Sequence, residues 1–292
     1  MIYNHNLQIR HKTVYHYSKP VELNPHQVFL IPSLRTYFRV NHYDIKISPN
    51  PAGTFERISL EGNPFQQFWF DKPTESLQIN VDIELFYRTF NPFGFLLDPD
   101  FGQLDDQGNL QVQYPASDHA YLKAYLVPHS SPVLMAFSQK VKSRCQDILG
   151  FLIQLTAEVH GHCKHLIRED EGIWPPEKCL NEKKGSCRDL SWLLIQLLRG
   201  EGIACRFVSG YAFNPELEEG HELHAWVEAY YPGAGWIGLD PNLGLLTDHL
   251  YFPLTASFDP SHTLPVQGTY GGTAESKMES YVEIKSLPLK KS

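Results

Sequence analysis

The sequence of 292 residues predicts an α+β fold: an N-terminal antiparallel β-sandwich-like domain, then a domain in which a central buried helix packs on an antiparallel sheet. Residues 77–85 alternate strictly between apolar and polar side chains, which is typical of a strand with one buried face. From residue 132 the apolar residues recur with a helical period instead. After residue 203 the chain returns to short strand-like segments separated by turns. We place the first domain at residues 1–130 and the second at residues 131–292.

Strand patterns recur through the first domain. The chain has 17 Phe and 15 Tyr, and aromatic side chains suit half-buried pleated surfaces. Turns rich in proline, asparagine and glycine, at 48–53 and 61–64, separate the alternating segments. Residues 91–131 show little periodicity and are expected to form a boundary region. The expected strands are Thr13–Tyr17, Tyr43–Ile47, Phe55–Leu60 and Leu77–Leu85.

The second domain is expected to begin with two helices, Val133–Leu149 and Phe151–Ile167, with Gly150 as the breaker between them. A largely apolar stretch follows at Leu190–Leu198, with glycines at its far end. An apolar segment of helical length that ends in glycines predicts a buried central helix. The expected strands after it are Ile203–Phe213, Ala225–Tyr231, Trp236–Asp240, Tyr251–Leu254 and Tyr281–Lys285.

The formal net charge of −8 argues against two classes of partner. Nucleic acids require a basic surface that displaces counterions from phosphates, and anionic membranes attract polybasic segments. No stretch approaches the roughly 18 apolar residues that a membrane-spanning helix requires. The first 17 residues mix polar and aromatic side chains, unlike a secretory signal. We therefore expect a cytoplasmic protein with no nucleic-acid or membrane partner.

The cysteines argue against a disulfide framework. Their number is odd and they include no CxxC pair, so the spacing of a structural zinc site is also missing. At least one cysteine is therefore free to be a buried apolar residue or a nucleophile. The five are Cys145, Cys163, Cys179, Cys187 and Cys205.

Two groups of histidines could suggest a metal. Residues 160–165 contain three histidines and a cysteine, but on a helix the cysteine would face the core while His162 and His165 point elsewhere. His221 and His224 form an HxxH pattern at the entry to a strand rather than on a helix. Surface histidines explain the first group better, and catalysis explains the second. We therefore expect no metal and no cofactor.

Cys187 is the candidate nucleophile. It follows Gly185 and stands where the buried helix would begin, and unpaired N–H groups and the helix dipole there favour a thiolate. Lys183, Lys184 and Arg188 add positive charge nearby. The alternative for any single cysteine is a buried structural role, since free cysteine is among the most buried residue types.

His224 and Asp240 are the candidate partners of this thiol. They belong to two consecutive expected strands that are joined by the strongly turn-forming segment 231–235. Folding this hairpin brings the imidazole and the carboxylate together at its open end. Asp240 could then accept a hydrogen bond from one ring nitrogen of His224 and leave the other for Cys187. The alternative is a histidine satisfied within the fold and an ordinary aspartate at a strand end.

Four short segments carry a resemblance to a known family: Lys184–Asp189, Arg206–Tyr211, His224–Glu228 and Gly235–Pro241. They resemble the core motifs of the bacterial transglutaminase-like family, whose members are often described as candidate cysteine proteases. Their order and spacing match the family's pattern, and four motifs are far more specific than one. Thr13–Tyr17, followed by Pro20 and Val21, resembles the family's companion N-terminal domain. Asp259 and the segment Pro265–Tyr270 resemble its C-terminal part, so the resemblance covers most of the chain.

The resemblance implies a transglutaminase-like (papain-like) core in which Cys187 is the nucleophile, His224 the general base and acid, and Asp240 its orienting partner. It implies acyl transfer through a thioester on a peptide or protein substrate, by a cysteine protease, an amidase or a transglutaminase. We favour hydrolysis of a peptide or isopeptide-like amide, because water needs no dedicated acceptor site. The alternatives are protein-glutamine transamidation or peptide-bond formation with an amine acceptor, and a non-catalytic binding role on the same fold.

No motif places a side chain that would stabilise an oxyanion. Trp174 could donate its indole N–H, although a place in the aromatic core suits it better. Backbone N–H groups at the start of the Cys187 helix could act unaided. The sequence leaves the role of the N-terminal domain open.

Overall fold

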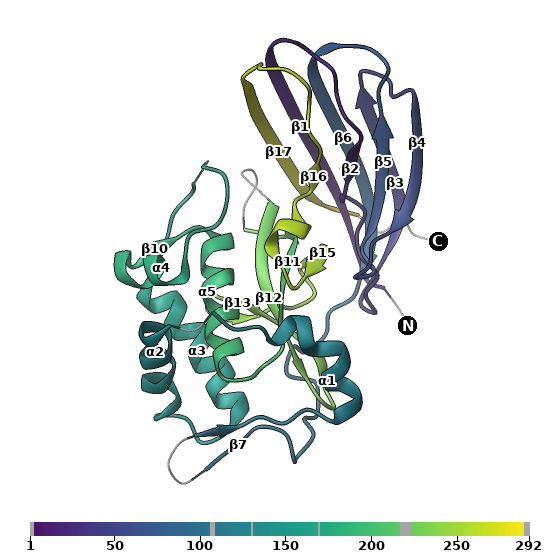
Figure 1. The fold of residues 1–292 in the computed structure, drawn as a ribbon. Helices are drawn as coiled ribbons and strands as arrows, with labels where there is room; N and C mark the ends of the chain where they lie inside the picture. The colour runs from purple at the N-terminus through teal and green to yellow at the C-terminus, as the bar shows by residue number, and fades with distance from the viewer. Residues whose placement is uncertain (1–2, 106–108, 130, 169, 217–222, 289–292) are drawn as a thin grey trace.

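The structure of the chain, a computed structural model, describes residues 3–105, 109–129, 131–168, 170–216 and 223–288. Figure 1 shows a β-sandwich lying beside a second body in which helices cover a sheet. Apart from one short parallel pair, every strand pairing among these residues is antiparallel. The α+β class predicted from the sequence is confirmed.

Two four-stranded sheets form the sandwich, in the orders β17-β1-β6-β3 and β16-β2-β5-β4. Along β6, the apolar residues from Leu77 to Leu85 are buried and the polar residues between them are only partly buried, as the alternation predicted. The strands are β1 (His5–Val21), β2 (His26–Val28), β3 (Phe38–Ser48), β4 (Gly53–Ile58), β5 (Pro64–Trp69), β6 (Thr74–Tyr87), β16 (Val266–Gln267) and β17 (Ser276–Leu287).

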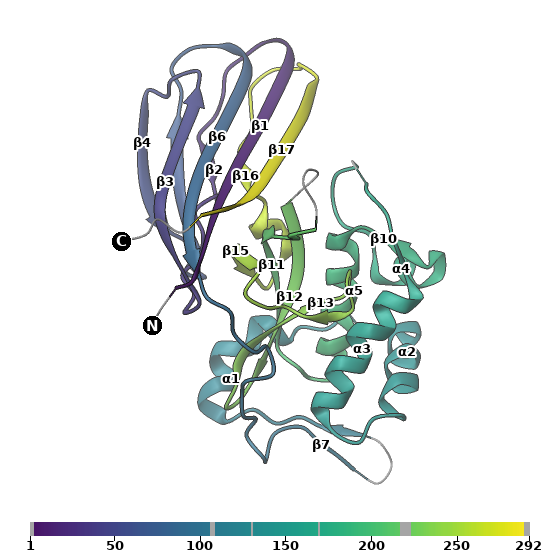
Figure 2. The same cartoon turned by 180° about the vertical axis from the view of Figure 1, so that it is seen from behind.

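The C-terminal strands complete the sandwich rather than the second body. β17 runs antiparallel to β1 from the pair Asn6–Leu287 to the pair Tyr17–Ser276, and β16 pairs with β2. Figures 1 and 2 show β17 at the edge of the sandwich beside β1. The sequence pattern places these segments in the second domain, because strand pairing between distant segments leaves no local signature. The boundary near residue 130 stays a prediction.

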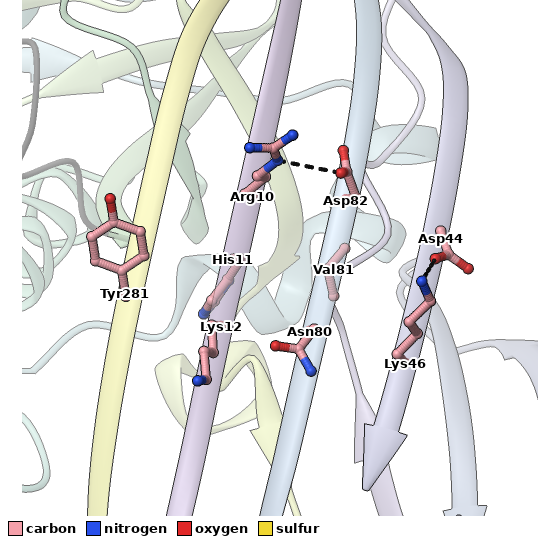
Figure 3. A pocket seen from close by; sticks show the side chains of 9 residues that line it. All are labelled: Arg10, His11, Lys12, Asp44, Lys46, Asn80, Val81, Asp82 and Tyr281. Atoms are coloured by element: carbon pink, nitrogen blue, oxygen red, sulfur yellow. Dashed lines mark hydrogen bonds and ion pairs between the residues drawn. The ribbon is translucent and has the colours of Figure 1, made fainter.

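The outer face of the first sheet carries a groove lined by charged side chains (Figure 3). Two ion pairs lie within it: Arg10 with Asp82 and Lys46 with Asp44, each at 3.4 Å. These exposed pairs cancel most of the charge that the groove would otherwise present to an ionic ligand. The residues that line it come from the four strands of this sheet, so the groove belongs to the sandwich alone.

The second body is built around a five-stranded sheet in the order β14-β13-β12-β11-β15. Helix α5 packs on this sheet and is covered by the other helices, as Figure 2 shows. Ten of its residues are buried, which confirms the predicted central helix. The elements are α2 (Pro132–Lys142), α3 (Ile148–His162), α4 (Pro176–Glu182), α5 (Cys187–Gly200), β11 (Cys205–Ala212), β12 (Leu223–Tyr231), β13 (Gly235–Asp240), β14 (Leu245–Leu246) and β15 (Tyr251–Ser257).

The boundary between the first two helices differs from the prediction. Helix α2 ends at Lys142, and Asp147 caps α3 by accepting a hydrogen bond from the N–H of Gly150 at 2.6 Å. Gly150 therefore lies inside the first turn of α3 and does not break the helix, because an aspartate at the N-cap satisfies an otherwise unpaired N–H group. The last predicted residues of α3 form instead the short strand β9 (Lys164–His165), which pairs in parallel with β10 (Lys184–Gly185).

The segment before α2 packs on the second body. The Tyr114 hydroxyl donates to the carbonyl of Tyr230 and accepts from the N–H of Ala204, both at 2.9 Å. Helix α1 (Ala116–Leu122) buries Leu122 in the same core as α5. The remaining elements are β7 (Gln103–Leu104), β8 (Leu110–Gln111), η1 (Lys123–Leu126) and η2 (Pro260–Thr263). In the described part of the chain, none of the helices is long and apolar enough to cross a bilayer.

Candidate active site

Cys187 is the first residue of α5, and the chain before it is tightly constrained. Ser186 is the N-cap, and a Cβ on Gly185 would come within 3.0 Å of the Leu190 side chain and 3.1 Å of the Asp189 Cβ. A larger residue there would push against both side chains, so glycine suits this close approach of the chain to the start of the helix. Cys187 is half-buried, and it belongs to the first turn of a helix, where backbone N–H groups lack partners within the helix.

Asp189 holds the residues at the start of α5 in place through hydrogen bonds. Its buried carboxylate accepts from the N–H and hydroxyl of Ser186 at 2.9 and 2.7 Å, and from the N–H of Trp174 at 2.8 Å. The guanidinium of Arg168 adds two bonds, at 3.0 and 3.1 Å. Burial opposes ionisation of Asp189, but these donors lower the pKa of its carboxyl. The ion pair therefore ties the loop preceding α4 to the residues that present the thiol.

The hairpin β12–β13 brings His224 and Asp240 into contact. Val227 pairs with Leu239 and Tyr231 with Gly235, a register that leaves His224 diagonally opposite Asp240. His224 Nε2 and Asp240 Oδ2 lie 2.8 Å apart. The geometry that the turn-forming segment predicted is therefore present between these two residues.

The carboxylate of Asp240 is completely buried and fully hydrogen-bonded. Its Oδ1 accepts from the N–H groups of Asn242 and Leu243, at 2.8 and 3.3 Å. Its Oδ2 accepts from His224 and from the Tyr251 hydroxyl, which lies 2.7 Å away. Burial opposes ionisation, but the His224 charge and these donors lower the pKa of Asp240. The side chain is held as an anion in one orientation.

Two histidines reach the Cys187 sulfur. Burial alone would raise the pKa of this thiol, but hydrogen bonds with His165 and His224, the charge of His224 and the Ala225 N–H lower it to about 6. His224 is desolvated, which favours its neutral form, yet Asp240 and Cys187 raise its pKa to about 10. Both shifts favour the charged form of each group, a thiolate beside an imidazolium.

His165 was not predicted to be a neighbour of the thiol. The sequence pattern assigns the histidines of residues 160–165 to a surface cluster, in which His165 belongs to a helix. In the structure β9 places His165 opposite Gly185, with the N–H of Leu166 donating to the Gly185 carbonyl at 3.0 Å. A parallel pair between segments 20 residues apart has no local signature, so only the structure reveals this contact.

The other histidines of the two groups have separate partners. His160 Nδ1 lies 2.8 Å from the Asn242 carbonyl, and His162 Nε2 lies 3.1 Å from that of Leu180. His221 lies outside the described residues. Within the described ranges, no three His, Cys, Asp or Glu side chains converge as metal ligands would.

Trp174, the candidate oxyanion donor, lies beside the site but is held by other groups. Two cations lie over its ring: the Lys178 ammonium is 3.8 Å and the Arg168 guanidinium 4.9 Å from the ring centre. Its backbone N–H is bonded to Asp189. These contacts hold the loop before α4 against the start of α5.

The thiol of Cys187 should react fastest with iodoacetamide near neutral pH. We expect its alkylation rate to rise through an inflection near pH 6, because its pKa is about 6. Burial raises the pKa of Cys163, Cys179 and Cys205 to about 11, 12 and 12. At pH 7 their reaction should be slower by about 10²-fold or more, since little thiolate is present. Peptide mass mapping of timed samples measures all four rates.

Variants test which donors lower this pKa. Replacing His165 with alanine should move the inflection for Cys187 to higher pH, because its hydrogen bond to the thiolate is lost. Replacing the exposed His119, which lies in α1, is the matched control and should leave the inflection in place. Equal alkylation rates across the cysteines would contradict activation of Cys187.

Comparison with known families identifies both bodies. Residues 7–85 match the model of the bacterial transglutaminase-like N-terminal region, and residues 135–241 match that of the transglutaminase-like superfamily. Together the two matches span more than half of the chain. The second match contains α5, β11, β12 and β13, the elements that carry Cys187, His224 and Asp240.

Similar proteins extend along different lengths of the chain. An uncharacterized protein of Mycobacterium leprae is 30% identical over 115 residues, which are 37% of this chain and 40% of that protein. An uncharacterized protein of Mycobacterium tuberculosis is 22% identical over 303 residues, covering 96% of this chain and 92% of that protein. The chain thus spans less than half of the first relative and nearly all of the second.

One solved structure shares the fold along nearly the whole chain. It is the crystal structure of a candidate cysteine protease from Cytophaga hutchinsonii, with a TM-score of 0.72 and 17% sequence identity. The likeness covers 99% of this chain and 92% of that chain. At this identity it shows the fold alone.

Proposed function

We propose that this chain, a member of the transglutaminase-like superfamily that carries the bacterial N-terminal region, is a cysteine-dependent enzyme that hydrolyses a peptide or isopeptide-like amide through a thioester on Cys187. One observation carries the proposal. Among the five cysteines, the thiol of Cys187 has a lowered pKa, and it contacts a histidine that is bonded to a buried carboxylate. Burial raises the pKa of the other four thiols.

The first half-reaction forms the thioester. The thiolate of Cys187 attacks the acyl carbonyl, and a sulfur–carbon bond forms as the carbonyl electrons move to oxygen. We assign stabilisation of this oxyanion to the N–H groups at the start of α5 and to His165, which bonds the same sulfur. The carbon–nitrogen bond then breaks, and the imidazolium of His224 gives its proton to the departing amine.

The second half-reaction regenerates the thiol. His224, now neutral, accepts a proton from the acyl acceptor as that acceptor attacks the thioester carbonyl. Water as acceptor releases a carboxylic acid, and an amine gives a new amide. In both cases Cys187 leaves as a thiolate. The proton either stays on His224, which restores the ion pair, or passes from His224 to the sulfur. Asp240 holds the imidazole in the orientation that both half-reactions need.

The test distinguishes acyl transfer from binding and hydrolysis from transamidation. Purified protein is incubated with p-nitrophenyl acetate and with a glutamine-containing peptide library, each with and without a primary amine. We expect an acetylated Cys187 in acid-quenched samples and carboxylic acid products whose yield the amine does not lower. Mass spectrometry detects the thioester and the products. Amine-linked products would show a transamidase, and a Cys187 that no ester or peptide acylates would refute the enzymatic proposal.

A cytoplasmic location is part of the proposal. A thiolate held ready for reaction is kept from oxidation in a reducing compartment. Separation of cells into cytoplasmic and envelope fractions would measure this location.

A further inference from the structure

Tyr251 is the second side chain on the acid of the site. Its hydroxyl donates to Asp240 Oδ2 at 2.7 Å, the same oxygen that receives His224 Nε2. The ring packs at 5.3 Å from the Trp226 ring and 6.2 Å from the His224 ring, centre to centre. Tyr251 thus contacts both partners of the thiol.

Burial and charge keep this hydroxyl protonated. Only 6% of Tyr251 is exposed, and burial followed by the charges of Asp240 and Asp248 raises the pKa of its phenol well above the ordinary value. Asp240, His224 and Asp248 are the ionisable groups that act on it from the second body, and the Tyr37 hydroxyl bonds its backbone carbonyl from the sandwich. Tyr251 therefore donates to the carboxylate throughout the pH range in which the thiolate–imidazolium pair exists.

The N-terminal sandwich forms hydrogen bonds to β15, the strand that carries Tyr251. β15 is the last strand of its sheet, so within the described residues its outer edge pairs with no further strand. The Tyr37 hydroxyl donates to the carbonyl of Tyr251 itself. Ser33 binds the next carbonyls, with its N–H to Pro253 at 2.8 Å and its hydroxyl to Leu254 at 2.5 Å.

The far end of β15 is held in the same way. The Asn63 side chain exchanges two hydrogen bonds of 2.9 Å with the backbone of Ala256. Arg35, from the same segment as Ser33 and Tyr37, forms an ion pair of 3.0 Å with the buried Glu228 on β12. Residues of the sandwich therefore take the place of a neighbouring strand from Tyr251 to Ala256. One of these contacts falls on Tyr251, the residue that bonds Asp240.

We propose that Tyr251 is a positioning residue for the active site and that the N-terminal sandwich, through Tyr37, holds it against Asp240. The inference rests on the proposed function. It gives the N-terminal region a defined role, because the carboxylate that orients His224 is itself oriented by a strand whose outer edge the sandwich completes. A catalytic body without its sandwich would keep the three reacting residues but lose this support.

Replacing Tyr251 with phenylalanine tests the first part. We expect the acetylation rate with p-nitrophenyl acetate to fall about 10- to 100-fold, as for other groups that orient a reacting residue, with KM unchanged. The inflection for alkylation of Cys187 should move up by about one pH unit, because a less fixed carboxylate stabilises the imidazolium less. A purely structural tyrosine would lower the melting temperature and leave this inflection in place.

A double-mutant cycle shows through which residue Tyr251 acts. If the tyrosine works through Asp240, adding Tyr251→Phe to Asp240→Asn should cause no further loss of rate. Independent, multiplying losses would overturn the inference. Tyr37→Phe should shift the inflection in the same direction by a smaller amount. Tyr125→Phe is the matched control, because its hydroxyl also joins the two bodies, at 2.9 Å from Glu61, away from Asp240.

The alkylation readout separates this inference from the proposed function. An inflection near pH 6 in the unaltered protein with no shift in Tyr251→Phe would overturn the positioning role and leave the enzyme proposal standing. A Cys187 without any low inflection would overturn both. A shift in Tyr125→Phe as large as that in Tyr37→Phe would show that any contact between the bodies has the same effect, and would overturn the specific role of Tyr37.

Discussion

Replacing Cys187 with alanine should abolish thioester formation and lower turnover by about 10⁵-fold or more, because the atom that bonds the acyl carbon is gone. Folding should change little. The side chain is small and partly exposed, and its removal also relieves the protein of holding a desolvated ion pair with His224. We expect the melting temperature to stay within a few degrees of that of the unaltered protein.

The serine variant is a sharper form of this experiment. Cys187→Ser keeps a hydrogen-bonding group of similar size, but a hydroxyl beside an imidazole is a far weaker nucleophile than a thiolate, so turnover should remain near the alanine level. Cys145→Ala, at the partly exposed cysteine after α2, is the matched control and should retain full activity. Release of nitrophenolate and acid-quench mass spectrometry measure both variants. Turnover by Cys187→Ala above one hundredth of the control would assign the reaction to another group.

Asp240→Asn should lower turnover by about 10⁴-fold, as loss of the orienting carboxylate does in related triads. The amide has the same size but no charge, so the pKa of His224 should fall from about 10 toward its ordinary value. The imidazolium would then no longer favour the thiolate, and the inflection for alkylation of Cys187 should rise. The pH profile of activity should narrow from both sides, since a higher pKa of Cys187 raises its acid limit and a lower pKa of His224 lowers its alkaline limit.

Stability decides whether Asp240 is catalytic or structural. A 10⁴-fold loss corresponds to roughly 5 kcal/mol of barrier. The amide oxygen can still accept from Asn242 and Leu243, so we expect the free energy of unfolding to fall by only about 1–3 kcal/mol. Thermal melts beside kinetic assays make the comparison. Losses of equal size in unfolding free energy and in activation free energy would mean that Asp240 mainly holds the fold.

The parts of the site that sequence predicted are those encoded locally. An apolar segment after a glycine predicts the helix that begins at Cys187, and a turn-rich segment between two strands predicts the contact of His224 with Asp240. Each requires only a short stretch of chain and one periodic pattern. These elements form as expected in the structure.

The parts that escaped prediction depend on pairing between distant segments. His165 reaches the sulfur through the parallel pair β9–β10, and Tyr251 reaches Asp240 because β15 joins the far side of β11. Neither arrangement is visible in a periodic pattern, since the order of strands in a sheet is set by packing of the whole domain. The prediction that Gly150 separates the two helices was wrong for a different reason. The capping residue Asp147, and not the glycine, sets where α3 begins.

The pairing of β17 with β1 has a consequence for biosynthesis. Thr13 has Ile79 on one side and Ser280 on the other, so a ribosome delivers the two neighbours of β1 about 200 residues apart. Through most of translation β1 therefore presents a bare hydrogen-bonding edge, the kind that recruits other nascent chains. Once β17 is in place it forms the edge of the sheet. Its ion pairs, Lys277 with Glu279 and Lys285 with Glu283, discourage a further strand from pairing there. A nonsense codon that falls after α5 but before residue 276 would leave an intact helix with its thiol on a protein prone to aggregate.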